Sequence, residues 1–171
     1  MARTEPGDID LLIMDVDGVL TDGRIIYDDA GRELKAFCVQ DGAGLKYWKR
    51  AGKKSAIITG RESGVVIRRA SELDIDLVHQ GALDKLPALR EILRDLDVPA
   101  ERTAYIGDDL PDIPPMRACG LAIAVANAVP EVKRIADIVT LCHGGQGAVR
   151  EAICMLLQGG GLWEKILQRY Q

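Results

Sequence analysis

Short apolar runs alternate with longer amphipathic stretches along most of this 171-residue chain, and this alternation constrains the fold more than any other feature. Apolar runs of four to six residues bounded by turn residues are typical of strands that are buried on both faces. Such strands are predicted at residues 9–14, 55–58, 77–80, 103–106, 121–125 and 138–141. Helices are predicted at residues 43–51, 63–73, 83–95, around Met116, 131–135 and 148–157.

Strands that alternate with helices form a parallel sheet covered by helices on both faces. The sequence therefore predicts an α/β fold with a three-layer, Rossmann-like sheet, in a single domain that spans residues 1–171. Two features stand apart from the alternation. Two β-prone segments within about 24–39 flank the turn residues 28–31 and predict a small β-hairpin after the first strand. Residues 162–171 predict a helical tail after a glycine-rich break.

The composition excludes several classes of protein. Apolar residues make up 47% of the chain and the net charge is −4, so no basic surface for nucleic acid is expected. No apolar run approaches the ~18 residues of a membrane span, and the first ten residues lack the apolar stretch of a signal peptide. The four cysteines form no CxxC pair, which favours free thiols and a cytoplasmic protein.

Polar clusters follow four of the predicted strands at the point where each strand ends. Asp15-Val16-Asp17-Gly18 follows the first strand, Thr59-Gly60-Arg61 follows the second, and Lys85 opens the helix after the third. The segment from Gly107 to Asp112 follows the fourth and carries three acids. The carboxyl ends of parallel strands meet at one edge of a sheet, where ligands bind, so these clusters are expected to share one crevice.

The chemistry of these side chains points to phosphoryl transfer. Carboxylates about 4 Å apart repel by roughly 4 kcal/mol per pair at an effective dielectric of ~20, so the cluster needs a cation. Oxygen ligands without histidine or cysteine suit Mg²⁺. Lys85 and Thr59 can bind the oxygens of a phosphoryl group. Asp15 can act as the nucleophile, and Asp17 can protonate the leaving alcohol and later deprotonate water.

The segment Asp15-Val16-Asp17-Gly18-Val19-Leu20-Thr21-Asp22 resembles the first motif of the haloacid dehalogenase superfamily. Thr59, Lys85 and the segment 108–112 resemble its second, third and fourth motifs in the same order. The resemblance implies that Asp15, the backbone carbonyl of Asp17, and Asp108 hold Mg²⁺. It also implies that Asp109 and Asp112 include an acid that supports the metal site, with Asp112 favoured over Asp109; otherwise both are loop caps.

A finer resemblance covers several segments. Four segments are similar to the 3-deoxy-D-manno-octulosonate 8-phosphate phosphatase family: Phe37-Cys38-Val39-Gln40-Asp41-Gly42, His79-Gln80-Gly81, Tyr105-Ile106-Gly107-Asp108-Asp109, and Gly144 to Glu151. The gaps between the motifs leave no room for a cap domain, so the open site should either act on macromolecules or be closed by another subunit, and the finer resemblance favours the second. The resemblance implies a homotetramer in which a hairpin completes the neighbouring site, and a product used for lipopolysaccharide. Gln40 replaces an arginine of many members, which weakens the transfer of carboxylate recognition.

Several residues keep two interpretations. Gly60, Arg61 and Arg69 are candidates for binding a substrate, although Arg69 equally suits the solvated face of a helix. Arg150 can reach the site or pair with an acid on its own helix. The apolar stripe of the tail can pack on its own core or contact another subunit.

Three other functions compete with the eight-carbon phosphatase. A phosphatase for a nine-carbon sugar acid 9-phosphate would share the same chemical core. A receiver domain also combines acids, threonine and lysine, but its phosphorylated aspartate follows a later strand. A non-catalytic regulatory relative is disfavoured because every expected catalytic position is present.

Overall fold

The computed structural model describes residues 4–171, in which six parallel strands form one sheet in the order β5-β4-β1-β6-β7-β8. The strands are β1 (Leu11–Met14), β4 (Lys54–Ile58), β5 (Leu77–His79), β6 (Thr103–Gly107), β7 (Leu121–Ala124) and β8 (Ile138–Val139). Each expected apolar run contributes one strand. The predicted parallel sheet is therefore confirmed.

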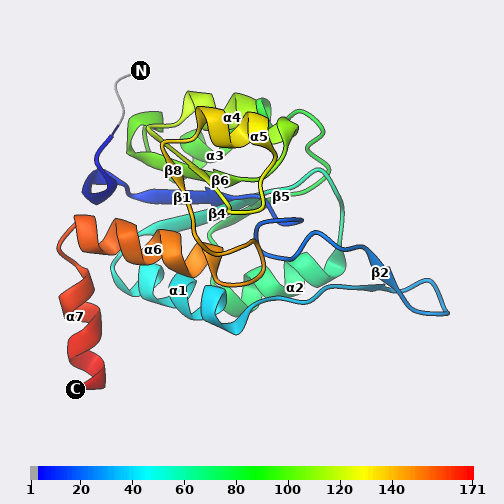
Figure 1. Cartoon of the computed structure of the whole chain (residues 1–171), viewed down its shortest axis with the longest axis horizontal. Coiled ribbons are helices and arrows are strands. Elements are labelled where there is room, and N and C mark those ends of the chain that lie inside the picture. Colours follow the sequence, from blue (N-terminus) through cyan, green and yellow to red (C-terminus); the bar gives the residue numbers. More distant parts are fainter. Residues whose placement is uncertain (1–3) are drawn as a thin grey trace.

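Helices cover both faces of the sheet (Figure 1). One face carries α3 (Lys85–Leu96), α4 (Ile113–Ala118) and α5 (Pro130–Ile135), and the other carries α1 (Val39–Arg50), α2 (Gly64–Leu73) and α6 (Ala148–Gly159). Short 3-10 turns occur at Pro6–Asp8, Ala100–Arg102, Leu110–Asp112 and Gln168–Tyr170. This is the expected three-layer architecture.

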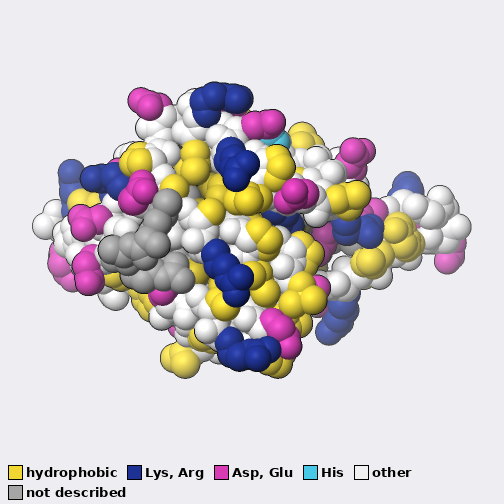
Figure 2. Space-filling view, turned by 90° about the horizontal axis from the view of Figure 1, so that it is seen from above, with side chains coloured by type: hydrophobic (Ala, Val, Ile, Leu, Met, Phe, Trp, Pro, Cys, Tyr) yellow, Lys and Arg dark blue, Asp and Glu magenta, His cyan; other side chains and the backbone are white. Residues whose placement is uncertain are grey.

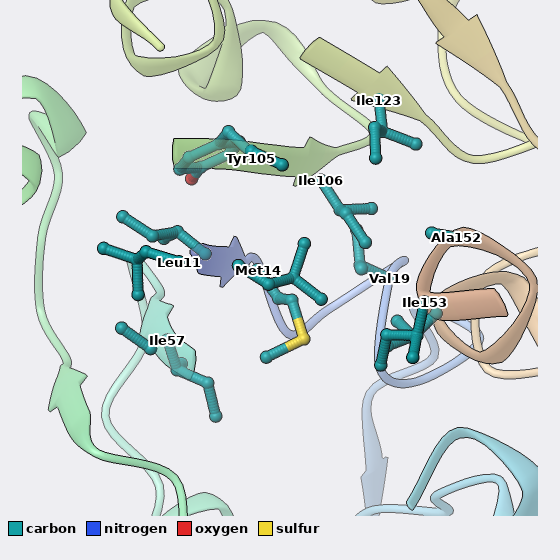
Figure 3. Close-up of a cluster of buried hydrophobic side chains, with 14 of the residues drawn as sticks. Leu11, Met14, Val19, Ile57, Tyr105, Ile106, Ile123, Ala152 and Ile153 are labelled. Carbon is teal, nitrogen blue, oxygen red and sulfur yellow. The ribbon is translucent and has the colours of Figure 1, made fainter. Parts of the chain in front are cut away.

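The core lies around the central strand β1, which pairs with β4 on one side and β6 on the other. All four residues of β1 are fully buried. Figure 3 shows Leu11 and Met14 among Ile57, Tyr105 and Ile106 from the neighbouring strands. Burying an aliphatic side chain of this size contributes about 1.5–3 kcal/mol, so a mainly aliphatic core holds the strand ends in place.

The hairpin is present but shorter than predicted. Its strands are β2 (Ile26–Tyr27) and β3 (Glu33–Leu34), and it projects away from the body of the molecule (Figures 1 and 2). The prediction of extended structure to residue 39 was wrong, because α1 begins at Val39 rather than at residue 43. The reason is tertiary: Asp41, in the first turn of α1, accepts hydrogen bonds from the backbone N–H groups of Gly147 and Arg150.

The expected tail is helical, comprising α7 (Trp163–Leu167) and the final 3-10 turn. Trp163 and Tyr170 make edge contacts with the ring of Tyr47 on α1, so the tail packs on its own chain. None of the four cysteines forms a disulfide bond. Within residues 4–171, every helix falls short of the length and apolar character needed to cross a membrane.

Candidate active site

One crevice forms where the carboxyl ends of β1, β4 and β6 meet. Met14 pairs with both Ile57 and Ile106, so the residues that follow each strand emerge at the same level. The crevice has a volume of about 220 Å³. Its lining contains every strand-end cluster expected from the sequence: Asp15, Asp17, Thr59, Gly60, Arg61, Ala82, Leu83, Lys85, Asp108, Asp109, Pro111 and Asp112.

Three carboxylates gather at the base of this crevice. Asp15, Asp108 and Asp112 each place an oxygen within 4.8 Å of the others, and all are at least half-buried. Burial, together with the charge of Asp112, raises the pKa of Asp15 to about 6. Burial and the charge of Asp15 raise the pKa of Asp108 to about 8. The cluster therefore favours either a proton or a cation.

Lys85 is the cation that this chain itself supplies to the cluster. Its Nζ lies 2.9 Å from Asp15 Oδ1 and 2.6 Å from Asp112 Oδ1, and its side chain is 5% exposed. Burial alone would lower the pKa of Lys85, but the carboxylates of Asp15 and Asp112 raise it above its ordinary value. Lys85 is therefore charged and fixed beside the expected nucleophile.

Asp112 anchors the loop after β6. Its carboxylate accepts hydrogen bonds from the Tyr105 hydroxyl at 2.9 Å and from the backbone N–H of Asp108 at 3.0 Å. It also accepts the backbone N–H of Asp109, whereas the Asp109 side chain caps the following 3-10 turn. A Cβ on Gly107 would lie 2.5 Å from Asp112 Cβ, so only glycine allows this approach. This geometry favours Asp112 over Asp109 as the acid that supports the site.

The loop after β1 contacts Asp108 closely. Gly18 has a φ of +96°, and a Cβ there would lie 2.1 Å from Asp108 Oδ2. Among the described residues, Asp108 Oδ1 is buried without a hydrogen-bond partner. An unpaired buried carboxylate oxygen beside two further carboxylates fits a hard cation such as Mg²⁺.

Thr59 and Asp17 lie in the same crevice. Thr59 is buried, and its hydroxyl accepts the backbone N–H of Arg61 at 3.4 Å. Asp17 is contacted by Lys35 Nζ, and Arg61 Nε lies 3.9 Å from Asp17 Oδ2. Lys35 was not among the residues expected at the site. The only signal for it was its place on the hairpin directly after the first motif.

Arg69, Gln40 and Arg150 are absent from the crevice lining. The Arg69 guanidinium lies 5.8 Å from the centre of the Phe37 ring and pairs with Glu72. The Arg150 guanidinium stacks on Tyr47, 4.5 Å from the ring centre, and donates to Cys154 Sγ. A role for Arg69 in substrate binding stays a prediction, and within this chain it would require a substrate that extends well beyond the crevice.

The family model for haloacid dehalogenase-like hydrolases matches residues 65–153. The 3-deoxy-D-manno-octulosonate 8-phosphate phosphatase of Haemophilus influenzae is 45% identical over 153 residues, covering 90% of this chain and 85% of the relative. The enzyme of the same name from Escherichia coli K12 is 46% identical over 153 residues, covering 90% of this chain and 81% of the relative.

The chain belongs to the 3-deoxy-D-manno-octulosonate 8-phosphate phosphatase family. A member from Moraxella catarrhalis, solved with magnesium, phosphate and a 3-deoxy-D-manno-octulosonate (KDO) molecule, has a TM-score of 0.95 and 44% identity, covering 97% of this chain and 95% of that chain. The cobalt-bound Haemophilus influenzae enzyme has a TM-score of 0.90 and 44% identity, covering 92% of each chain. The predicted family and fold are thereby confirmed.

Proposed function

We propose that this protein is a Mg²⁺-dependent phosphatase that hydrolyses 3-deoxy-D-manno-octulosonate 8-phosphate through an aspartyl-phosphate. The observation that carries the proposal is the juxtaposition of Asp15, Lys85 and the unpaired oxygen of Asp108 in one crevice. Phosphoryl transfer needs a nucleophile, a cation held beside it, and a carboxylate oxygen that can bind a metal ion. Relatives that share 45–46% of this sequence carry the name of this activity.

In the first half of the reaction, a carboxylate oxygen of Asp15 attacks phosphorus as the bond from phosphorus to the sugar oxygen breaks. Lys85 and the hydroxyl of Thr59 bind the transferring oxygens. Asp17 gives its proton to the leaving oxygen, so the sugar departs as an alcohol. Asp15, Asp108 and the backbone carbonyl of Asp17 would hold Mg²⁺, which supplies charge neutralisation at the phosphoryl group.

In the second half, a water molecule attacks the phosphorus of the aspartyl-phosphate. Asp17, now ionised, takes a proton from that water, and the Asp15 carboxylate is released. The network around Asp112 keeps Lys85 and the Asp108 loop in place during both steps. Because Asp112 accepts from a side-chain ammonium, a phenol and two backbone N–H groups, it holds the loop without needing to contact the substrate.

The size of the crevice supports an assembly of subunits. Its volume of about 220 Å³ lies below the ~300–1,000 Å³ of pockets that enclose a whole small ligand. It is therefore suited to the phosphate end of the substrate, with the sugar acid reaching outside. We infer that the protein is a homotetramer in which the hairpin of one subunit covers the site of its neighbour and supplies the remaining wall. We also infer that it acts in the cytoplasm. The hairpin exposes apolar side chains suited to such a contact: Ile25, Ile26, Tyr27 and Leu34.

A panel of phosphate esters tests the proposal. Purified protein with Mg²⁺ is expected to release phosphate repeatedly from the eight-carbon sugar acid 8-phosphate, and more slowly from nine-carbon 9-phosphates. A preference for the nine-carbon esters would assign the protein to that substrate class. Gln40, which replaces an arginine of many family members, bears on this choice of substrate. Single-turnover release would instead indicate a receiver-like domain, and no turnover of any ester would overturn the proposal.

The variant Asp15→Asn is expected to keep its fold and lose about 10³-fold or more in kcat, because the amide cannot form the acyl-phosphate. Asp95→Asn is a matched control, because Asp95 is an exposed helix acid paired with Arg94. Circular dichroism checks the fold of both variants. Substantial turnover by Asp15→Asn would exclude Asp15 as the nucleophile.

A further inference from the structure

A lysine at the end of the hairpin contacts Asp17, the expected acid/base. Lys35 follows β3 directly, and its Nζ contacts Asp17 Oδ1. The Lys35 side chain is 1% exposed, although the residue as a whole is only half-buried because its backbone remains open. A buried ammonium is costly unless it is paired, so the contact with Asp17 determines where this side chain lies.

Glu33 joins this contact to a second cation. Its Oε1 lies 3.4 Å from Lys35 Nζ and 3.1 Å from Arg61 Nη2. Arg61 Nε in turn lies 3.9 Å from Asp17 Oδ2, on the other carboxylate oxygen. Lys35 therefore contacts one oxygen of the Asp17 carboxylate, Arg61 lies near the other, and Glu33 pairs with both cations.

The two oxygens of Asp17 are not equivalent in this arrangement. Oδ1 is in direct contact with the Lys35 ammonium, whereas the cation found beside Oδ2 among residues 4–171 is Arg61, whose Nε lies 3.9 Å away. Asp17 also lines the crevice beside Asp15 and Thr59. An acid/base must present one oxygen to the leaving group at hydrogen-bond distance, and a loss of orientation slows proton transfer.

We propose that Lys35 is a positioning residue that fixes Asp17 so that the proton exchanged with the leaving group travels on Asp17 Oδ2. This inference rests on the proposed phosphatase chemistry and deepens it. As the bond between Asp15 and phosphorus forms, the bond from phosphorus to the ester oxygen breaks. The Asp17 Oδ2 proton moves to that oxygen, leaving Asp17 as a carboxylate beside Lys35.

The dependence on the leaving group separates positioning from a purely structural role. An alkoxide leaving group needs the proton, whereas p-nitrophenolate departs without one. The value of kcat/KM reports steps up to the first irreversible one, which includes cleavage of the ester. For Lys35→Met we expect kcat/KM for the octulosonate 8-phosphate to fall about 10- to 100-fold, as part of the ~10²–10⁴-fold that a general acid contributes. For p-nitrophenyl phosphate we expect a change below about threefold.

Two further variants test whether Lys35 acts through Asp17. Adding Lys35→Met to Asp17→Asn is expected to cause almost no additional loss, because the side chain that Lys35 orients can no longer exchange the proton. Lys35→Arg keeps a cation and is expected to recover part of the lost activity. Lys53→Met is the matched control, since Lys53 is a largely buried lysine paired with Asp10 just before β1, at the opposite edge of the sheet. We expect it to retain wild-type kcat/KM for both esters.

Equal losses for both esters would overturn the inference and assign Lys35 to hairpin structure alone. A further large loss in the Asp17→Asn background would also overturn it. Failure of the proposed function is distinguishable, because the wild-type protein would then turn over neither ester.

Discussion

At the scale of single residues, the site is a balance of like charges held together by a few fixed partners. Asp15, Asp108 and Asp112 would repel by several kcal/mol without compensation, and Lys85 compensates only two of them directly. Asp108 is the member without a cation of its own, and its pKa is raised further than that of Asp15. The repulsion among these carboxylates therefore lowers the stability of the fold, whereas it favours the binding of a divalent ion.

This balance predicts a pH-dependent stability in Mg²⁺-free solution. The pKa of Asp108 rises from the ordinary 3.8 to about 8 on folding, so the folded state holds a proton that the unfolded state releases. The free energy of unfolding should therefore fall as the pH rises from about 4, the pKa in the unfolded state, to about 8, the pKa in the folded state. In Asp108→Asn this fall should be smaller, because the amide does not titrate. Urea unfolding in EDTA at several pH values measures it.

Mg²⁺ should reverse the loss, since a ligand that binds the folded state alone stabilises it by RT ln(1 + [L]/Kd), where [L] is the free ligand concentration. The rise in Tm on adding Mg²⁺ is expected to grow with pH in the wild-type protein and to be nearly absent in Asp108→Asn. Asp95→Asn, an exposed carboxylate outside the site, should behave as the wild type does. An identical Mg²⁺ response in Asp108→Asn would show that Asp108 is not a ligand.

At the scale of elements, a glycine-rich loop holds the catalytic loop against α6. Gly145 donates its backbone N–H to the carbonyl of Val19 at 2.8 Å. Gly144 donates to Asn127 Oδ1 at 2.8 Å, and a Cβ on Gly144 would lie 1.7 Å from the carbonyl oxygen of Gly18. The loop that carries the nucleophile therefore rests on backbone that only glycine can supply.

Substitution of two different glycines is expected to have opposite effects on the free energy of unfolding. Gly144→Ala must displace the backbone of Gly18, so we expect a loss of about 1–3 kcal/mol in the free energy of unfolding, with a large loss of kcat. Gly64→Ala, at the first residue of α2, meets no atom within 4 Å and should stabilise the protein by about 0.4–1 kcal/mol. Denaturant unfolding compares the two. Equal stability of both variants would contradict the proposed support.

The elements that the sequence predicted well are those whose pattern is local. The runs that became β1, β4, β6 and β7 are bounded by turn residues and needed no distant partner to be recognised, and the motif residues at their ends then fell into one crevice. The start of α1 was missed because Gly42, just before the predicted helix, is a poor helix former. In the structure Gly42 and Gly44 allow close packing: a Cβ on Gly44 would lie 3.2 Å from the Cα of Arg150 on α6.

Lys35 was missed because its place at the site depends on tertiary structure. Its contact with Asp17 spans 18 positions and depends on where the chain returns from the hairpin to the body of the molecule. Neither residue type nor spacing distinguishes it from the surface lysines, such as Lys46, which pairs with Asp74. Only the fold of the hairpin assigns it to the site.

At the scale of the whole molecule, the hairpin is a projecting arm with apolar side chains and no core of its own (Figure 2). Its strands have two residues each, and Ile26 and Tyr27 are 41% and 58% exposed. An isolated hairpin of this length is marginally stable in water. Contact with a neighbouring subunit would bury its apolar face and would enlarge the wall of a crevice whose volume, about 220 Å³, lies below the ~300 Å³ of the smallest typical ligand pockets.

The variant Ile26→Glu tests this assembly because a charge on the apolar face of the arm opposes burial between subunits. We expect its mass by light scattering to fall below that of the wild-type protein. Its kcat/KM for the octulosonate 8-phosphate should fall about tenfold or more, since removing one central apolar contact from an interface costs about 1–2 kcal/mol or more. Activity toward p-nitrophenyl phosphate should change less, because that ester needs little beyond the crevice.

Val139→Glu on β8 is the control with matched exposure, 42% against 41%, and should leave mass and activity unchanged. A wild-type protein that is monomeric at assay concentrations yet fully active would show that the arm serves its own site, through Lys35 and Glu33, without a partner.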